Sequence, residues 1–127
     1  IEKLPKLIAV QAANIAPIFQ AWKSGLDFVT KVQHTKETIA EGVAISQPAR
    51  GRRLLQVVKE TGGEVLAIEE DQITSAQKRL AIKGCYIDPT SALPVAGFTD
   101  LLEMIAKSDT VVIPLTGNGL KGKPKQT

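Results

Sequence analysis

The chain has 127 residues, enough for one domain built around one hydrophobic core. Its 43% of apolar and 23% of charged residues exclude a disordered or fibrous protein, and its 4% of aromatic residues predicts an aliphatic core. The net charge of +3 comes from scattered basic residues, concentrated only at 50–53 and in the tail from residue 121. We interpret both groups as solvated, so no nucleic-acid partner is expected.

Cysteine usage and hydropathy indicate the compartment. Cys85 is the single cysteine, which excludes an internal disulfide and is consistent with a reducing, cytoplasmic environment. It follows Gly84 in apolar surroundings and is interpreted as a buried structural thiol. No apolar run approaches the length of a membrane span and no signal peptide is visible, so no membrane partner is expected. The chain opens with Ile1 directly before a strand-like run, which suggests a piece of a longer protein.

The chain begins with a predicted strand and a predicted helix. Residues 7–10 (LIAV) form a short aliphatic strand. A helix follows over 16–24, with Pro17 tolerated in its first turn and Gly25 closing it. A connecting loop over 26–37 comes next.

A capping-box pattern marks the next predicted helix, over 38–45 (TIAEGVAI). Thr38 and Glu41 have the spacing at which each side chain binds a backbone amide of the new helix. Gly42 lies inside this helix and costs about 1 kcal/mol against alanine. Either a close approach at that face explains the glycine, or Gly42 ends the helix.

Helices and strands alternate in the second half of the chain. Pro48 starts a helix that Gly62–Gly63 terminates, and a strand follows over 64–68 (EVLAI). The next helix covers 71–84, and the three acids at 69–71 are interpreted as its cap, because carboxylates complement the helix dipole, in preference to a metal site.

The remaining predicted elements define the fold class. They are an extended piece at 85–87, a long helix over 92–107 introduced by Asp88, and a buried strand over 110–115. Alternating strands and helices predict an α/β protein, a three-layer doubly wound, mostly parallel sheet. We expect residues 1–120 to form a single domain and 121–127 a basic tail.

Thr116 is the first polar residue beyond the predicted strand at 110–115, and Gly117 and Gly119 let the backbone turn away at once. Open α/β sheets place ligand-binding groups at the carboxyl ends of buried strands. Thr116 is therefore a candidate ligand-binding residue, although its hydroxyl could also simply cap the turn.

Other functional motifs are rejected. The run from Gly117 to Gly122 matches a dinucleotide-binding fingerprint, but no helix and strand follow it, as the mechanism requires. No phosphate-binding P-loop, metal-ligand spacing or nucleophile elbow is present. His34, the only histidine, is expected to be a solvated loop residue.

Three segments together resemble the carboxyl-terminal part of pyridoxal-phosphate enzymes with the tryptophan-synthase-β fold (fold type II), and most closely the threonine synthases. They are TIAEGVAI at 38–45, DPTSALPVAG at 88–97 and PLTGNGLK at 114–121. The opening run PKLIAVQAANIAPI is similar to the strand and turn after the phosphate loop of these enzymes. The resemblance covers nearly the whole chain in the same order and spacing.

The resemblance implies a role for several residues. Thr116, with Gly117, would lie at the pyridine nitrogen of pyridoxal 5′-phosphate. A carboxylate at this position would hold a proton on the ring nitrogen, whereas a neutral hydroxyl does not. Ala40 would lie against the ring, with Glu41 near it, although a capping role for Glu41 is an equal alternative. Asp88, where the family usually has glutamate, and Ser91 would support the site from one layer behind the cofactor.

The resemblance also implies what this chain lacks. The lysine that binds the cofactor covalently and the glycine-rich phosphate loop precede the matched region in this family, so we expect no catalytic residue here and an inactive isolated chain. Some relatives bind a divalent cation near the first strand, but Gln11 and Pro17 occupy those positions, so no metal is expected.

The implied parent is a threonine synthase, a lyase that converts O-phospho-L-homoserine and water to L-threonine and phosphate. A relative of the threonine and serine dehydratases, or a cysteate-forming relative, is the first alternative, and a non-catalytic α/β binding module is the second. The expected partners are a small amino-acid substrate in the parent, the missing N-terminal part of the enzyme, and further copies in a homo-oligomer. Exposed strand edges predict that the isolated chain associates or is marginally stable.

Overall fold

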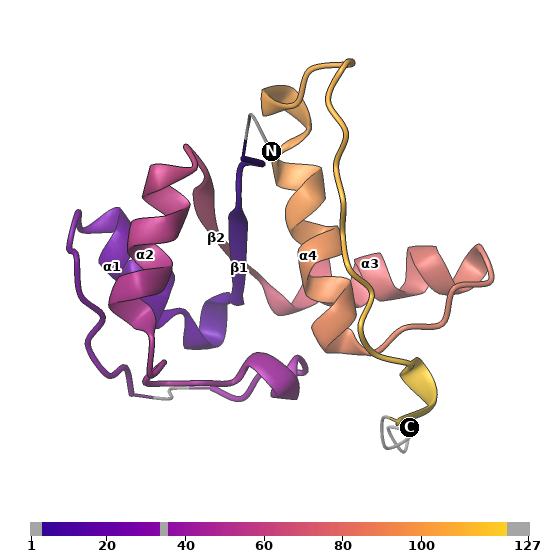
Figure 1. Ribbon diagram of the computed structural model, residues 1–127. Helices are drawn as coiled ribbons and strands as arrows, with labels where there is room; N and C mark the ends of the chain where they lie inside the picture. Colours follow the sequence, from indigo (N-terminus) through magenta and orange to yellow (C-terminus); the bar gives the residue numbers. More distant parts are fainter. Residues whose placement is uncertain (1–3, 34–35, 122–127) are drawn as a thin grey trace.

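The computed structural model describes residues 4–33 and 36–121, and shows three layers built around two parallel strands (Figure 1). The strands are β1 (Ile8–Ala12) and β2 (Glu64–Ile68), with Ile8 opposite Glu64 and Ala12 opposite Ile68. Predictions that concern His34 and residues 122–127 of the tail lie outside the described residues.

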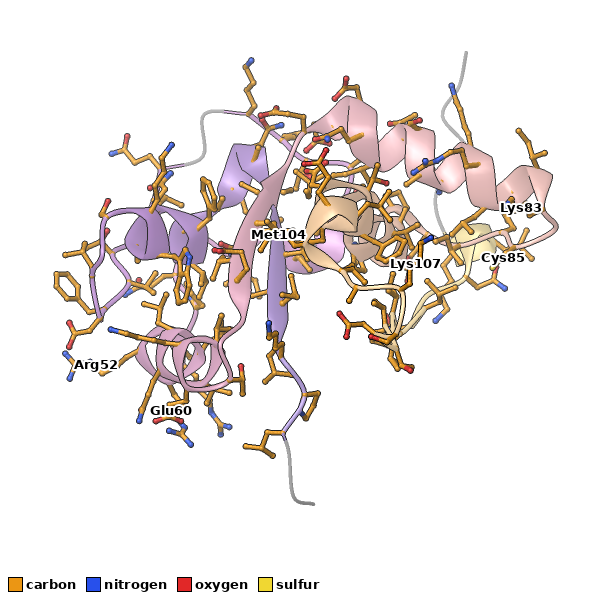
Figure 2. The ribbon with its side chains drawn as sticks, turned by 90° about the horizontal axis from the view of Figure 1, so that it is seen from above. Arg52, Glu60, Lys83, Cys85, Met104 and Lys107 are labelled. Carbon is orange, nitrogen blue, oxygen red and sulfur yellow. The ribbon has the colours of Figure 1, made fainter. Side chains whose placement is uncertain are left out.

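Four α-helices flank the strands. The helices α1 (Pro17–Lys23) and α2 (Gly51–Glu60) lie on one side, and α4 (Pro89–Asp100), with α3 (Glu70–Ile82) packed against it, lies on the other (Figure 1). The view from above shows the same order, with Arg52 and Glu60 at the edge of the α2 layer and Lys83 and Cys85 beyond the end of α3 (Figure 2). The α/β class with parallel strands is therefore confirmed.

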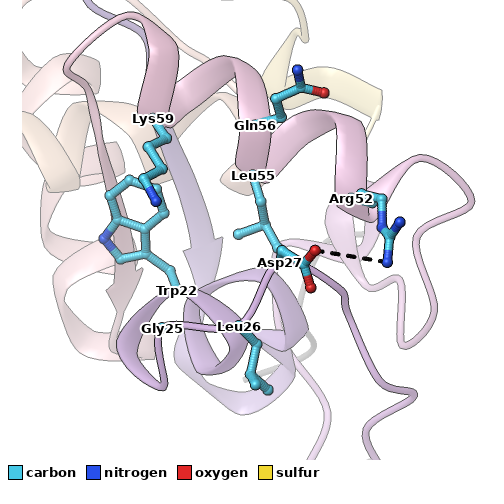
Figure 3. A pocket seen from close by; sticks show the side chains of 8 residues that line it. All are labelled: Trp22, Gly25, Leu26, Asp27, Arg52, Leu55, Gln56 and Lys59. Carbon is cyan, nitrogen blue, oxygen red and sulfur yellow. Dashed lines mark ion pairs between the residues drawn. The ribbon is translucent and has the colours of Figure 1, made fainter.

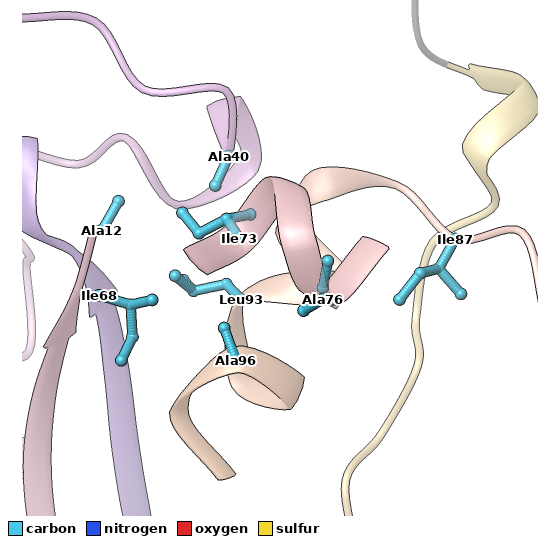
Figure 4. Packing of buried hydrophobic residues seen from close by; sticks show 9 residues of the cluster. Ala12, Ala40, Ile68, Ile73, Ala76, Ile87, Leu93 and Ala96 are labelled. Atoms are coloured by element: carbon cyan, nitrogen blue, oxygen red, sulfur yellow. The ribbon is translucent and has the colours of Figure 1, made fainter. Parts of the chain in front are cut away.

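Side chains that alternate along the strands divide the interior into two cores. Val65 packs with Ile18 and Leu55 in the core between the sheet and α1 and α2. Ala12 and Ile68 belong to the other core, beneath α3 and α4. Figure 4 shows this second core, in which small and branched aliphatic side chains interlock: Ala12, Ala40, Ile68, Ile73, Ala76, Ile87, Ala92, Leu93 and Ala96. The predicted aliphatic core is confirmed.

The predicted helix ends are largely confirmed. Gly25 and Gly62 follow α1 and α2 with φ of 67° and 65°, the left-handed conformation that closes helices. The acidic run before α3 is a cap: the Glu69 side chain accepts from the backbone at Gln72, while Gln72 Oε1 accepts from Glu69 N at 3.0 Å.

The predicted strand at 110–115 is wrong. This segment is extended but pairs with neither strand, and Val112 is 82% exposed. Figure 1 shows why: the segment runs along the side of α4, and the sheet that would have to receive it ends at β1 and β2 among the described residues. The pattern of consecutive aliphatic residues is typical of burial on two faces, but no neighbouring strand supplies those faces among the residues that the structure describes.

The predicted helix at 38–45 is also wrong. Only a single 3-10 turn forms, at Glu41–Val43, with Val43 N donating to Ala40 O at 3.0 Å and Ala44 N donating to Glu41 O at 3.1 Å. The Gly42 amide, which in a helix starting at Thr38 would donate to the Thr38 carbonyl, donates instead to Thr90 Oγ1 at 3.2 Å. Thr38 Oγ1 accepts from Ala40 N at 3.1 Å, and the 3-10 turn has no side-chain cap, so the predicted capping box between Thr38 and Glu41 does not form.

Other elements differ from their predicted bounds. The helix predicted to start at Pro48 begins at Gly51, after a turn that includes Arg50 as its N-cap. The helix expected over 92–107 begins at Pro89 and ends at Asp100, followed by a 3-10 turn at Leu102–Met104. The extended piece at 85–87 forms only an isolated antiparallel bridge between Ile87 and Asn118. Cys85 is half-buried and packs against the α3–α4 core. Among the described residues, no helix is both long and apolar enough to span a membrane.

Candidate functional site

The candidate site is built on the start of α4. Asp88 has extended backbone and forms the N-cap, with Oδ1 accepting from Ser91 N at 2.8 Å. Pro89 occupies the first helical turn, where its missing amide costs nothing. The sequence D-P-x-S therefore fixes this helix end through one cap and one proline.

The turn after Thr116 is held against this helix end. Ser91 is buried, and its Oγ accepts from Gly117 N at 2.8 Å, while Asp88 N donates to Gly117 O at 3.4 Å. A Cβ at Gly117 would collide with the Asp88 carboxylate, so only glycine fits between the helix cap and the turn. The side chain that caps the turn is Asn118, whose Oδ1 accepts from Leu120 N at 2.9 Å.

The segment from Thr38 to Val43 approaches the same helix end from the other side. Gly42 N donates to Thr90 Oγ1 at 3.2 Å, and a Cβ on Gly42 would lie 2.8 Å from that oxygen. The close approach predicted as an explanation of Gly42 is confirmed. Thr90 and Ser91 are adjacent, so the three segments on which the resemblance rests converge on consecutive residues of α4.

A hydrogen-bond cluster that no sequence motif indicates holds this segment in place. Glu70, at the start of α3, accepts from Ile39 N through Oε2 at 2.9 Å and from Asn14 Nδ2 through Oε1 at 3.3 Å. Asn14 Nδ2 also donates to Glu37 O at 2.7 Å. The partners lie far apart in the chain and share no motif, so only the fold brings them together.

The predicted cofactor residues differ in their accessibility. Thr116 and Glu41 are exposed and Gly117 is half-buried, so all three can meet a molecule at the start of α4. Ala40 is 0% exposed and packs in the α3–α4 core (Figure 4). The predicted contact of Ala40 with the cofactor ring stays a prediction. In this structure the Ala40 side chain packs in the hydrophobic core.

Gln11 and Pro17, which occupy the positions where some relatives bind a cation, have a structural role in this chain. Gln11 Oε1 accepts from Ile18 N at 2.8 Å and from Phe19 N at 3.0 Å, which satisfies two amides of the first turn of α1. Pro17 is the first residue of that helix. Within 4–33 and 36–121, no group of three or more histidine, cysteine, aspartate or glutamate side chains could hold a metal ion.

The chain belongs to the family of pyridoxal-phosphate dependent enzymes, whose family model matches residues 1–117. Pyridoxal phosphate is the cofactor of this family.

Within the family, the chain is similar to curated threonine synthases. It is 36% identical to the threonine synthase of Methanosarcina acetivorans over 123 residues, which cover 94% of this chain and 30% of that protein. It is 34% identical to the enzyme of Methanocaldococcus jannaschii over 124 residues, 95% of this chain and 30% of that protein. The chain thus spans about a third of the length of the relatives it matches.

A solved structure supports the fold. The crystal structure of a threonine deaminase from T.th. superposes with a TM-score of 0.64 and 18% sequence identity, covering 79% of this chain and 35% of that one. The α/β fold with parallel strands is therefore that of a fold type II pyridoxal-phosphate enzyme.

The groups at the start of α4 fit such a cofactor at the turn. Thr116 offers an exposed, neutral hydroxyl, which can donate to an unprotonated ring nitrogen. Gly117 presents no side chain beside it, and its backbone is fixed by Ser91. An exposed, uncharged donor suits a pyridine ring nitrogen better than it suits an anion or a metal ion.

Proposed function

We propose that this chain is the carboxyl-terminal part of the cofactor-binding domain of a threonine synthase. The whole enzyme converts O-phospho-L-homoserine and water to L-threonine and phosphate. One observation carries the proposal: the segments at 39–42, 88–91 and 116–117 meet at one helix end, in a chain that is similar over 94% of its length to threonine synthases.

The chain would supply one wall of the cofactor site. Thr116 would donate its hydroxyl hydrogen to the ring nitrogen, Ala40 would lie against the ring, and Glu41 would lie near it. The cofactor, when bound, supplies the electron sink that the chemistry needs. Because Thr116 is neutral, it leaves the ring nitrogen without a proton and so limits the strength of that sink.

Asp88 and Ser91 would act by holding Thr116 in position. Ser91 fixes the amide of the residue that follows Thr116, and Asp88 fixes Ser91 through the helix cap. An error of about 1 Å in the position of a binding group is enough to cost catalysis severely, so this rigidity matters to the proposed role. We propose Gly117 as part of the same wall, since it contacts both supporting residues.

The remaining groups of the reaction would come from elsewhere in the enzyme. We propose that the covalent lysine and the phosphate loop are contributed by a preceding N-terminal part, so that the isolated chain is inactive. A homo-oligomer in the cytoplasm is proposed for the whole enzyme. The cytoplasmic location is supported by the single cysteine.

A dehydratase-like enzyme is the second candidate. The structural similarity to a threonine deaminase favours it only at the level of the fold, because the two chains share 18% identity. The curated threonine synthases, at 32–36% identity, favour the first candidate.

The discriminating experiment measures product formation by the full-length protein that contains this chain. A threonine synthase releases inorganic phosphate from O-phospho-L-homoserine, whereas a dehydratase forms a keto acid from threonine or serine. Keto-acid formation without phosphate release would overturn the assignment. For the isolated chain, purified and free of unbound cofactor, we expect no absorbance band in the region where the lysine-bound cofactor absorbs.

Thr116 provides the site-specific prediction. In the full-length protein, Thr116→Val removes the hydroxyl at nearly constant volume, and we expect phosphate release to fall about tenfold or more, while Thr116→Ser retains most of it. The matched control is Thr110→Val, in the same exposed segment, which should change activity by less than about twofold. Equal activities of the two valine variants would contradict the proposed contact.

A further inference from the structure

A hollow lies on the opposite side of the sheet from the start of α4. It is formed by α1, the loop after it and α2, and its volume is about 550 Å³ (Figure 3). Pockets that hold small molecules typically measure about 300–1,000 Å³, so this one is large enough for a ring with one substituent. It belongs to the α1–α2 layer, and none of the residues proposed for the cofactor lines it.

The inner wall of the hollow is apolar. Leu55, only 4% exposed, and the half-buried Trp22 belong to the α1–α2 core, and Leu26 adds a further aliphatic side chain from the loop. The flat indole of Trp22 beside an aliphatic wall suits an aromatic ring, which can stack on one and pack against the other. Figure 3 shows Trp22 and Lys59 on one side of the hollow and Arg52 on the other.

The rim of the hollow is basic. Arg52 and Lys59 line it, against one carboxylate, Asp27. The Arg52–Asp27 pair is 3.8 Å apart, with side chains 73% and 81% exposed, so it is weak and leaves the guanidinium available. A smaller recess of about 320 Å³ adjoins the hollow, shares Arg52 with it and adds Arg50 and Arg53.

The position of these charges favours an anion bound at the rim. Among the described residues, the ion pairs are Arg52–Asp27 and Arg53–Glu60, the second at 3.9 Å. Arginine presents a planar fork of donors that matches phosphate oxygens, and lysine adds a point charge. A ligand anchored by its ring on the inner wall would therefore place an anionic substituent among cations.

We propose that this hollow binds a small molecule that joins an aromatic ring to a phosphate group. The ring lies against Trp22 and Leu55, and the phosphate is held by Lys59, while Arg52 on the other side of the hollow adds to the positive potential there. This binding goes beyond the function proposed above, because it needs neither the cofactor nor the residues at the start of α4.

The test uses phenyl phosphate as the probe and the 127-residue chain, at a protein concentration at which sedimentation shows no self-association. Trp22 is the only tryptophan, so its fluorescence reports on the hollow alone. We expect a saturable change in emission with phenyl phosphate, and binding at least about tenfold weaker for phenol and for inorganic phosphate, because each lacks one of the two anchors. No saturable change, or equal affinity for inorganic phosphate, would overturn the proposal.

A matched pair of variants assigns the binding to this hollow. Lys59→Gln removes a rim cation and should raise the Kd for phenyl phosphate by about threefold to tenfold. Lys78→Gln makes the same change of charge on the exposed face of α3, and should alter the Kd by less than about twofold. Chemical-shift changes of the backbone amides of 52–59 give a second readout that does not depend on fluorescence. Equal effects of both variants, or unchanged binding by Lys59→Gln, would refute the assignment.

Discussion

Single hydrogen bonds decide the geometry of the candidate cofactor site. The Ser91 hydroxyl is the contact through which α4 fixes the turn after Thr116, and it is almost completely buried. Gly117 is required at its position, because a side chain there would displace the Asp88 carboxylate. The position of Thr116 thus depends on two neighbouring residues that need not touch the cofactor themselves.

Ser91→Ala is therefore expected to destabilise the chain. The substitution leaves Gly117 N without its acceptor, at a cost of about 1–2 kcal/mol. Ser75→Ala is the matched control, because Ser75 is exposed within α3 and alanine there should gain up to about 0.5 kcal/mol of helix propensity. Urea denaturation followed by circular dichroism measures both. A midpoint for Ser91→Ala equal to that of Ser75→Ala would show that the Ser91 bond contributes nothing.

Elements whose signals are local could be predicted from the sequence. The strands at 7–10 and 64–68, the acidic cap before α3 and the glycines after α1 and α2 are all predictable, because each depends on residues within a few positions. The convergence of Gly42, Thr90, Ser91 and Gly117 could be expected only through the family resemblance. No periodicity or spacing in the chain indicates it.

Elements that depend on distant partners could not be predicted. The run 111–115 has the composition of a buried strand, but a strand also needs a neighbour, and none of the described strands lies beside it. The run 38–45 has a capping-box spacing, but Thr38 binds its own segment and Gly42 binds Thr90. For the run 111–115 and for Gly42, the outcome depends on parts of the chain far away in the sequence.

The hydrogen bonds of Glu70, which join the start of α3 to the segment at Ile39, can be tested by substitution. Glu70→Ala removes the acceptor of Ile39 N, and we expect the Ile39 amide to exchange with deuterium about tenfold faster or more, because its segment is released from α3. Amides within α2, on the other side of the sheet, should be unaffected. Glu103→Ala, which removes an exposed carboxylate, serves as the control. Unchanged protection of Ile39 would show that Glu70 does not hold the segment.

As a whole, the molecule exposes more surface than a self-contained domain. Its accessible area is 9220 Å², whereas a compact monomer of 13.6 kDa is expected to expose about 6,600 Å². Apolar side chains contribute to this excess at Ile82, Met104, Val112 and Leu120. The surplus supports the proposal that further parts of an enzyme cover this surface.

The isolated chain should therefore associate with itself. We expect its weight-average sedimentation coefficient to rise with concentration, and Val112→Lys to reduce that rise by replacing an exposed apolar side chain with a charge. Thr110→Lys adds the same charge nearby without removing apolar surface, and should have a smaller effect. A concentration-independent monomer would argue against an incomplete surface.

The parallel pairing of β1 with β2 constrains the order of events during synthesis on the ribosome. Ile8 cannot meet Glu64 until the intervening loop and α2 have emerged from the exit tunnel. Throughout that interval, the backbone groups along both edges of the nascent β1 have no partner strand from this region of the chain. Codon changes that slow translation between residues 51 and 63 should therefore lengthen the period in which chaperones recognise the newborn chain.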